Sequence, residues 1–317
     1  MGDVLETEPD TGRVLHMGGL TRHRRGPAAA RDLEYAVVDV ETTGLDPREG
    51  ARVCEIAVVR MRGDGAVLSE FSTLVDPGVP LGGQEFHGIG ASDVVGAPKA
   101  AELVDVLAEL FSGAVVTGHN LDFEGRFLAA ELHPAGLPGE LPGLCTLRAL
   151  RAQVDLPRYS LPRASHALGG HWPTAQHTAL GDARACAQLL AELLANAPGP
   201  LHYTGPEPRP LEFPRRQRAV GKTRTPWSGP EGVRAARANP ERPPASWPPR
   251  WRELELDFRS CGGRFDADQR AAAERAAGQR ALARDALAGA AVLTGVLAAA
   301  GAVRQAERGL RRIARRG

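Results

Sequence analysis

Two carboxylates in the segment Asp39-Val40-Glu41 have a spacing that suits shared chemistry. They follow an apolar run, residues 35–38, that predicts a buried strand. Alternate side chains of an extended chain point to one face, so both carboxylates face the same side. Two like charges there are unfavourable unless a cation neutralises them. Hard carboxylate oxygens suit Mg²⁺ or Mn²⁺. Two interpretations of this segment are open: a metal site, or an edge strand whose acidic end lies in solvent.

Two further segments place acidic and histidine side chains near the start of predicted helices. Residues 118–128 read Gly-His-Asn-Leu-Asp-Phe-Glu-Gly-Arg-Phe-Leu and follow a short apolar strand. Residues 177–184 read His-Thr-Ala-Leu-Gly-Asp-Ala-Arg, with a histidine five residues before the aspartate that opens an apolar helix. A histidine can accept a proton near neutral pH, which suits it to acid–base chemistry.

Hydrophobic patterns predict the elements that carry these segments. Strands are expected over residues 53–61 and 66–75, joined by a hairpin turn at residues 62–65. Further along, the patterns predict helices over residues 99–111, 161–168 and 178–194, a strand over residues 114–117, and a helix capped by Asn120. Three strands in a meander followed by alternating helices and strands indicate an α/β domain with a mixed sheet over residues 32–197.

The three segments, taken in order, resemble the three motifs of the DEDDh 3′–5′ exonucleases. That family includes the proofreading epsilon subunit of bacterial DNA polymerase III and RNase T. His87-Gly88-Ile89 also resembles the family's loop after the third strand. The resemblance covers about residues 32–197. It implies an RNase H-like mixed sheet flanked by helices, with two divalent ions, Mg²⁺ or Mn²⁺.

The resemblance assigns roles residue by residue. Asp39 and Glu41 match the metal ligands of the first motif, and Asp182 matches the ligand of the last motif. His177 matches the general base that deprotonates the attacking water. Two ions roughly 3.5–4 Å apart would stabilise the attacking and leaving oxygens of phosphodiester hydrolysis.

A second group of residues matches positions that contact the substrate in the family. Thr42 and Thr43 match the turn whose backbone approaches the 3′ end, and Leu45 matches the apolar residue that wedges against the terminal base. His87 lies in a loop bounded by glycine. Two roles for His87 are open: it closes over the substrate, or it only packs within the loop.

One position departs from the family pattern. The family has Asp after the Phe of the second motif, whereas Glu124 follows Phe123 here. The side chain of Glu124 is one methylene longer, so its carboxylate still reaches a metal or a metal-bound water. Asp122 is the alternative ligand, but on a helix it points about 200° away from Glu124. We therefore expect Glu124 to be the fourth metal ligand.

The charge and proline content divide the chain. Residues 1–200 have a net charge of −10 and residues 201–317 a net charge of +11, which suggests a polyanionic partner. Residues 1–31 are polar and are expected to be disordered. Residues 198–252 form a predicted Pro/Arg-rich linker, because 13 of the 25 prolines lie between residues 198 and 249. Residues 253–317 are expected to form an Ala/Arg-rich basic helical tail.

The cysteine pattern and the hydrophobicity of the chain bear on its cellular compartment, and the resemblance bears on its partners. The four cysteines form no Cys-x-x-Cys pair, which fits free thiols in the cytoplasm and disfavours a zinc site. Residues 286–303 contain no charge, but their alanine and glycine content makes a membrane helix unexpected. The expected partners are nucleic acid 3′ ends, as single-stranded DNA or frayed duplex, and a replication or repair complex. The sequence indicates no oligomeric state.

The prediction is therefore a metal-dependent 3′–5′ exonuclease that releases nucleoside monophosphates from DNA. An exoribonuclease acting on RNA or short oligonucleotides is a second hypothesis, because the motifs act on the phosphodiester and not on the sugar. A catalytically weak nucleic-acid-binding module is a third, favoured by the departure at Glu124 and disfavoured by the other four matched residues.

Overall fold

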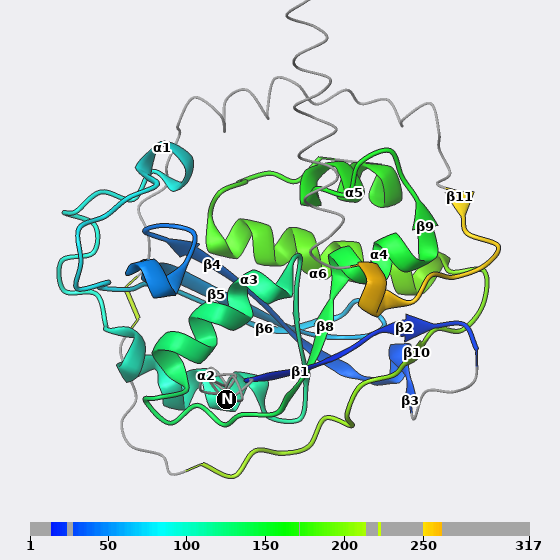
Figure 1. Cartoon of the computed structure of the whole chain (residues 1–317), viewed down its shortest axis with the longest axis horizontal. Coiled ribbons are helices and arrows are strands. Elements are labelled where there is room, and N and C mark those ends of the chain that lie inside the picture. Colours follow the sequence, from blue (N-terminus) through cyan, green and yellow to red (C-terminus); the bar gives the residue numbers. More distant parts are fainter. Residues whose placement is uncertain (1–13, 24–27, 171, 214–220, 223–249, 262–317) are drawn as a thin grey trace, which may run out of the picture. The chain divides into compact units, whose positions relative to one another are not determined.

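The computed structural model describes residues 14–23, 28–170, 172–213, 221–222 and 250–261 (Figure 1). These residues belong to one compact unit within residues 1–261, a mixed α/β fold with a six-stranded sheet of order β1-β8-β7-β4-β5-β6. The strands of this sheet are β1 (Leu15–Gly18), β4 (Glu34–Thr42), β5 (Val53–Arg62), β6 (Val67–Leu74), β7 (Val115–Gly118) and β8 (Leu141–Cys145).

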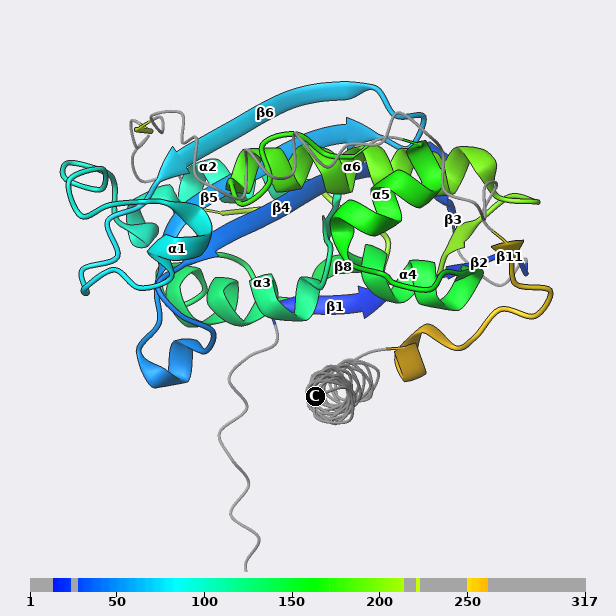
Figure 2. The same ribbon diagram turned by 90° about the horizontal axis from the view of Figure 1, so that it is seen from above.

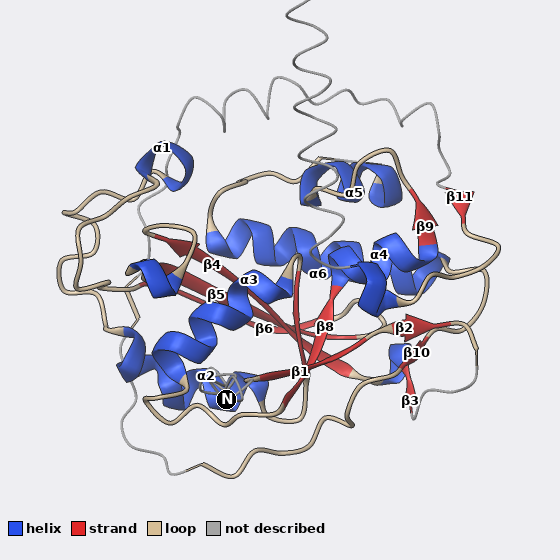
Figure 3. Ribbon diagram, in the orientation of Figure 1, coloured by secondary structure: helices blue, strands red, loops and turns tan. Residues whose placement is uncertain are grey.

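Helices flank this sheet (Figure 3). They are α1 (Gln84–His87), α2 (Val104–Phe111), α3 (Leu121–Phe127), α4 (Thr146–Gln153), α5 (Leu161–Gly169) and α6 (Ala179–Asn196). The short strands are β2 (Leu20–Thr21), β3 (Ala28–Ala29), β9 (Val154–Asp155), β10 (His202–Tyr203) and β11 (Arg250–Trp251). Shorter helical turns are Ala30–Asp32, Pro47–Glu49, Ala100–Leu103, Leu128–Leu132 and Phe258–Cys261.

The strands β4, β5 and β6 form the antiparallel meander that the sequence predicted. The hairpin turns at Gly65, whose φ of 95° lies in the left-handed region that glycine tolerates. On the other side of β4, the strands β7, β8 and β1 are parallel to it. Residues 35–38 are buried, as expected for an apolar run at the centre of a sheet covered on both faces.

The helix α6 lies across β4 and β5 on one face of the sheet, and α5 packs against α6 (Figure 2). The helix α2 lies on the opposite face. The apolar side of α6, which includes Ala183, Leu190 and Leu193, is fully buried. This packing holds the first turn of α6 over the carboxyl-terminal half of β4.

The N-terminal segment differs from the expectation of disorder up to residue 31. Leu15–Gly18 form β1, an edge strand of the sheet that pairs in parallel with Leu141–Leu144 of β8. Gly18 has no room for a side chain, since a Cβ there would lie 2.4 Å from the backbone nitrogen of Gly205. The run Leu15-His16-Met17-Gly18 is too short and too polar to predict a strand, so its pairing depends on contacts distant in sequence.

The ordered unit also extends past the predicted boundary at residue 197. His202–Tyr203 pair with both β2 and β3, and Arg250–Trp251 pair with β9. The following residues, 252–261, contact α4, where Nη1 of the buried Arg151 donates to the carbonyl oxygen of Cys261 at 3.0 Å.

The remaining predictions for the C-terminal half concern residues that the structure largely does not describe. Most of the predicted linker and the helical tail from residue 262 onward, including residues 286–303, lie outside the described residues. Among the residues that are described, no helix has the length and apolar character needed to cross a membrane.

Candidate active site

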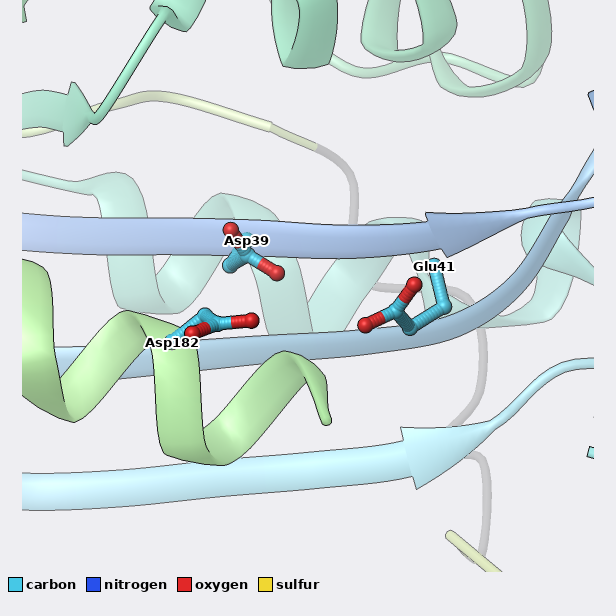
Figure 4. Close-up of side chains that lie close together, drawn as sticks. All are labelled: Asp39, Glu41 and Asp182. Atoms are coloured by element: carbon cyan, nitrogen blue, oxygen red, sulfur yellow. The ribbon is translucent and has the colours of Figure 1, made fainter. Parts of the chain in front are cut away.

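Three carboxylates from two elements point toward one another beside the sheet (Figure 4). Asp39 and Glu41 project from the same face of β4, as the alternation of a strand requires. Asp182 projects from the first turn of α6. One oxygen from each of the three side chains lies within 4.8 Å of the others.

The electrostatics of this group are those of several carboxylates held close together in a largely buried place. Burial is the main cause that raises the pKa of Asp39 well above its usual value, and the negative charges of Asp182, Glu124 and Glu41 add to it. Burial likewise raises the pKa of Asp182 to about 6, although hydrogen bonding and the nearby His177 lower it. Several hard oxygen donors converging in a part-buried site fit a divalent cation, which would offset this repulsion.

Glu124 lies next to this group without belonging to its 4.8 Å set. It is in the first turn of α3, its side chain is only 5% exposed, and its Oε2 has no hydrogen-bond partner among the described residues. Burial raises the pKa of Glu124 to about 8. A buried carboxylate oxygen without a partner is unfavourable in the metal-free protein, so its environment suits a bound cation.

Asp122 is oriented as the helical geometry predicted. It forms an ion pair with Arg148, and its side chain is 46% exposed. The structure therefore places Glu124 toward Asp39 and leaves Asp122 at the surface, paired with a residue of α4.

His177 lies in the turn that leads into α6. Its φ of 61° is left-handed, which is uncommon for a residue other than glycine. This backbone conformation accompanies a hydrogen bond from the His177 N–H to Oδ2 of Asp182 at 2.9 Å. The half-buried His177 is thus fixed beside one of the three clustered carboxylates, close enough to lower the pKa of Asp182.

The turn after β4 is held by its own hydrogen bonds. Oγ1 of Thr42 donates to the carbonyl oxygen of Gly44 at 2.7 Å. Thr43 and Arg52 are joined twice, by Thr43 N–H to Arg52 O at 2.8 Å and by Arg52 N–H to Thr43 Oγ1 at 3.0 Å. Leu45 is 78% exposed. The chain therefore presents an apolar side chain to solvent from a well-fixed turn.

The structure also gives the contacts of His87 and the backbone geometry of Asn120, two residues that the sequence singled out. His87 is buried, donates from Nε2 to the carbonyl oxygen of Gly82 at 2.9 Å and accepts from the Ile89 N–H at 3.0 Å, so it packs within its loop. The predicted cap role of Asn120 is wrong. Asn120 is left-handed, with φ 103°, and its side chain makes no capping hydrogen bond, so its contribution is the turn between β7 and α3.

Sequence reasoning missed Glu55. This residue lies on β5 directly across from Glu41, is 3% exposed, and accepts a hydrogen bond from the Ala179 N–H at 3.0 Å. A charged residue inside the apolar run of residues 53–59 was the available signal, since buried acids are rare without a partner.

Comparison with known proteins agrees with this arrangement. Residues 36–190, which include all the carboxylates described above, match the exonuclease family. We call residues 36–190 the exonuclease-family domain. The exonuclease-family domain resembles a DNA polymerase III subunit epsilon-like protein of Rhodobacter capsulatus, with 38% identity over 168 residues, or 51% of this chain and 24% of the relative. It resembles the PolC-type DNA polymerase III of Thermotoga maritima with 31% identity over 162 residues, or 50% of this chain and 12% of that protein.

The chain thus spans about a quarter or less of the length of these two relatives. Among solved structures, the exonuclease I of Methylocaldum szegediense is similar, with 19% identity and a TM-score of 0.44. That match covers 52% of this chain and 41% of exonuclease I.

Proposed function

We propose that the exonuclease-family domain is a metal-dependent 3′–5′ exonuclease that hydrolyses DNA from its 3′ end and releases nucleoside monophosphates. The observation that carries this proposal is the convergence of Asp39, Glu41 and Asp182 within 4.8 Å. The sheet order β8-β7-β4-β5-β6 with an antiparallel β5 supports an RNase H-like fold. Converging carboxylates can hold the divalent ions that assist phosphodiester hydrolysis, the reaction of an exonuclease.

The site residues divide the work of hydrolysis. Asp39, Glu41 and Asp182 would hold two divalent ions, Mg²⁺ or Mn²⁺, and Glu124 would complete the set from α3. When bound, the ions stabilise the negative charge that develops on the attacking and leaving oxygens. His177 accepts the proton of the attacking water as the general base. Its position beside Asp182 supports this role.

The turn after β4 receives the 3′ end of the substrate. Its exposed Leu45 packs against the terminal base, and the backbone of Thr42 and Thr43 approaches the terminal nucleotide. The names of two relatives, an epsilon-like protein and a PolC-type polymerase, favour DNA as the substrate. They also favour a partner in DNA replication or repair.

The decisive experiment compares three substrates with the full chain. Single-stranded DNA, duplex DNA with a 3′ mismatch and RNA, each labelled at the 5′ end, are incubated with Mg²⁺ or Mn²⁺. We expect a ladder that shortens from the 3′ end of the DNA substrates and no degradation in a chelator. Faster degradation of RNA would replace this proposal with the exoribonuclease, and binding without degradation would replace it with a nucleic-acid-binding module.

A further inference from the structure

Glu55 is a buried acid that the proposed mechanism does not use. It lies on β5 with 3% of its surface exposed, inside a strand that is otherwise apolar from Val53 to Val59. An acid in such a position is unfavourable unless hydrogen bonds satisfy it. The contacts of Glu55 therefore indicate why the strand tolerates it.

Its oxygen Oε2 accepts the N–H of Ala179, the first residue of α6, at 3.0 Å. The first amides of a helix have no partner within the helix, and a carboxylate there also interacts favourably with the helix dipole. Two other hydrogen bonds are internal to this turn: Thr178 Oγ1 accepts from the Gly181 N–H, and Asp182 accepts from the His177 N–H. The bond to Glu55 differs from them because it ties the turn to the sheet.

This tie matters because the metal-binding group is assembled from two elements. β4 supplies Asp39 and Glu41, whereas α6 supplies Asp182. Before an ion binds, these negative charges repel one another. Repulsion of this kind favours movement of the first turn of α6 away from β4, and a hydrogen bond from β5 to that turn opposes the movement.

We propose that Glu55 is a positioning residue. By accepting the Ala179 N–H, it holds the first turn of α6 on the sheet, so that Asp182 and His177 keep their places for the reaction. The catalytic part of this inference rests on the proposed function. If Glu55 were instead a further metal ligand, Glu55→Gln would lose activity, which is the opposite prediction.

Two variants separate the hydrogen bond from the charge. Glu55→Gln keeps an oxygen that can accept the Ala179 N–H but removes the negative charge. Glu55→Met has a similar volume and removes the acceptor. We expect kcat on 5′-labelled single-stranded DNA with Mn²⁺ to stay within about threefold of wild type in Glu55→Gln and to fall ~10–100-fold in Glu55→Met, the effect of a small misplacement of reacting groups. The KM for DNA should change little in either variant.

Hydrogen exchange measures the positioning itself. Amides of residues 179–182 should exchange faster in Glu55→Met and at the wild-type rate in Glu55→Gln. Glu131 offers a matched control, because its Oε1 accepts the Val53 N–H at 2.8 Å at the start of the same strand. Glu131→Met should lower thermal stability, with kcat and exchange of residues 179–182 near wild type.

Three results would overturn the inference. The first is a Glu55→Gln variant as inactive as Glu55→Met, or with weakened Mn²⁺ binding, which would indicate a ligand. The second is an equal loss of kcat in Glu131→Met. The third is unchanged exchange at residues 179–182 in Glu55→Met. If Glu55→Met does not fold, Glu55→Gln decides alone. If wild type degrades no nucleic acid, the proposed function fails, and the exchange data still decide the role of Glu55.

Discussion

Glu124 and Asp122 lie two residues apart on α3, yet they have opposite environments. Glu124 is buried and its Oε2 lacks a partner among the described residues, whereas Asp122 pairs with Arg148 at the surface. We expect Glu124→Gln to be nearly inactive and Asp122→Asn to be nearly normal. Glu124→Asp should retain activity or increase it. Degradation rates of single-stranded DNA at fixed Mg²⁺ measure this difference, and a larger loss in Asp122→Asn would contradict the assignment.

Asp39 and Asp182 are expected to be needed for activity and not for folding. Their carboxylates repel each other in the metal-free protein, so Asp39→Asn or Asp182→Asn relieves repulsion while it removes a metal ligand. Nuclease activity should be lost, and the Tm in a chelator should stay equal or rise. Calorimetry and a degradation assay on the same preparation check both parts. Wild-type turnover in either variant would refute the metal site.

His177 is expected to affect turnover more than metal binding. His177→Ala should lower kcat by roughly 10²–10⁴-fold, the usual contribution of a positioned acid or base. The Asp182 hydrogen bond comes from the His177 backbone and so survives the substitution. A titration of Mn²⁺ against activity measures the result. Recovery of kcat at high Mn²⁺ would show that His177 supports metal binding instead.

The residues of the site differ in how far the sequence predicts them. The two-residue spacing of Asp39 and Glu41 is local, so strand alternation alone places both carboxylates on one face. Asp182 joins them only because α6 crosses β4, and motif order supplied that information. Glu55 was missed because its partner, Ala179, lies 124 residues away along the chain.

At the scale of elements, the meander and the helix α6 follow from patterns within each segment. The strands β1, β10 and β11 do not, because each is four residues or fewer and pairs with a distant segment. Short strands have too little periodicity to be detected, and tertiary contacts decide whether they form. For this reason the sequence did not predict the short strands that lie outside residues 32–197.

Gly18→Ala tests whether β1 is part of the folded domain. A Cβ at residue 18 would meet the backbone of Gly205 at 2.4 Å and the ring of Tyr203 at 2.5 Å. We expect a loss of about 1–3 kcal/mol in the free energy of unfolding, as for other overpacked sites. Gly199→Ala is the control, because nothing lies within 4 Å of a Cβ there. Equal stabilities of the two variants would mean that the N-terminal strand is not docked.

For the whole molecule, the acidic site makes stability depend on pH and metal. The pKa of Glu124 is raised from 4.5 to about 8, so the folded state binds more protons than the unfolded state between these values. The stabilising contribution of the protonated group is complete below pH 4.5 and is lost as the pH rises through 8.

We therefore expect the Tm of the chelated protein to fall from pH 5 to pH 8. Added Mg²⁺ or Mn²⁺ should raise the Tm most at pH 8, because fewer protons then compete with the ion. Calorimetry at several pH values, with Glu124→Gln as a variant of shallower slope, provides the measurement. A Tm in chelator that rises over this range would contradict the raised pKa of Glu124.

The contact between the two ends of the described chain has a consequence for biosynthesis. Glu255 accepts hydrogen bonds from the hydroxyl of Thr21 and the N–H of Arg22, and Gln153 donates to both Leu20 and Glu255. During translation, β1 is made before its partner β8, and β2 is made before its partner β10 and before Glu255. Pairings this distant are slow to form. The nascent domain therefore holds β1 unpaired until β8 is made and β2 unpaired until β10 is made, and their backbone hydrogen-bonding groups stay open to other chains in the meantime.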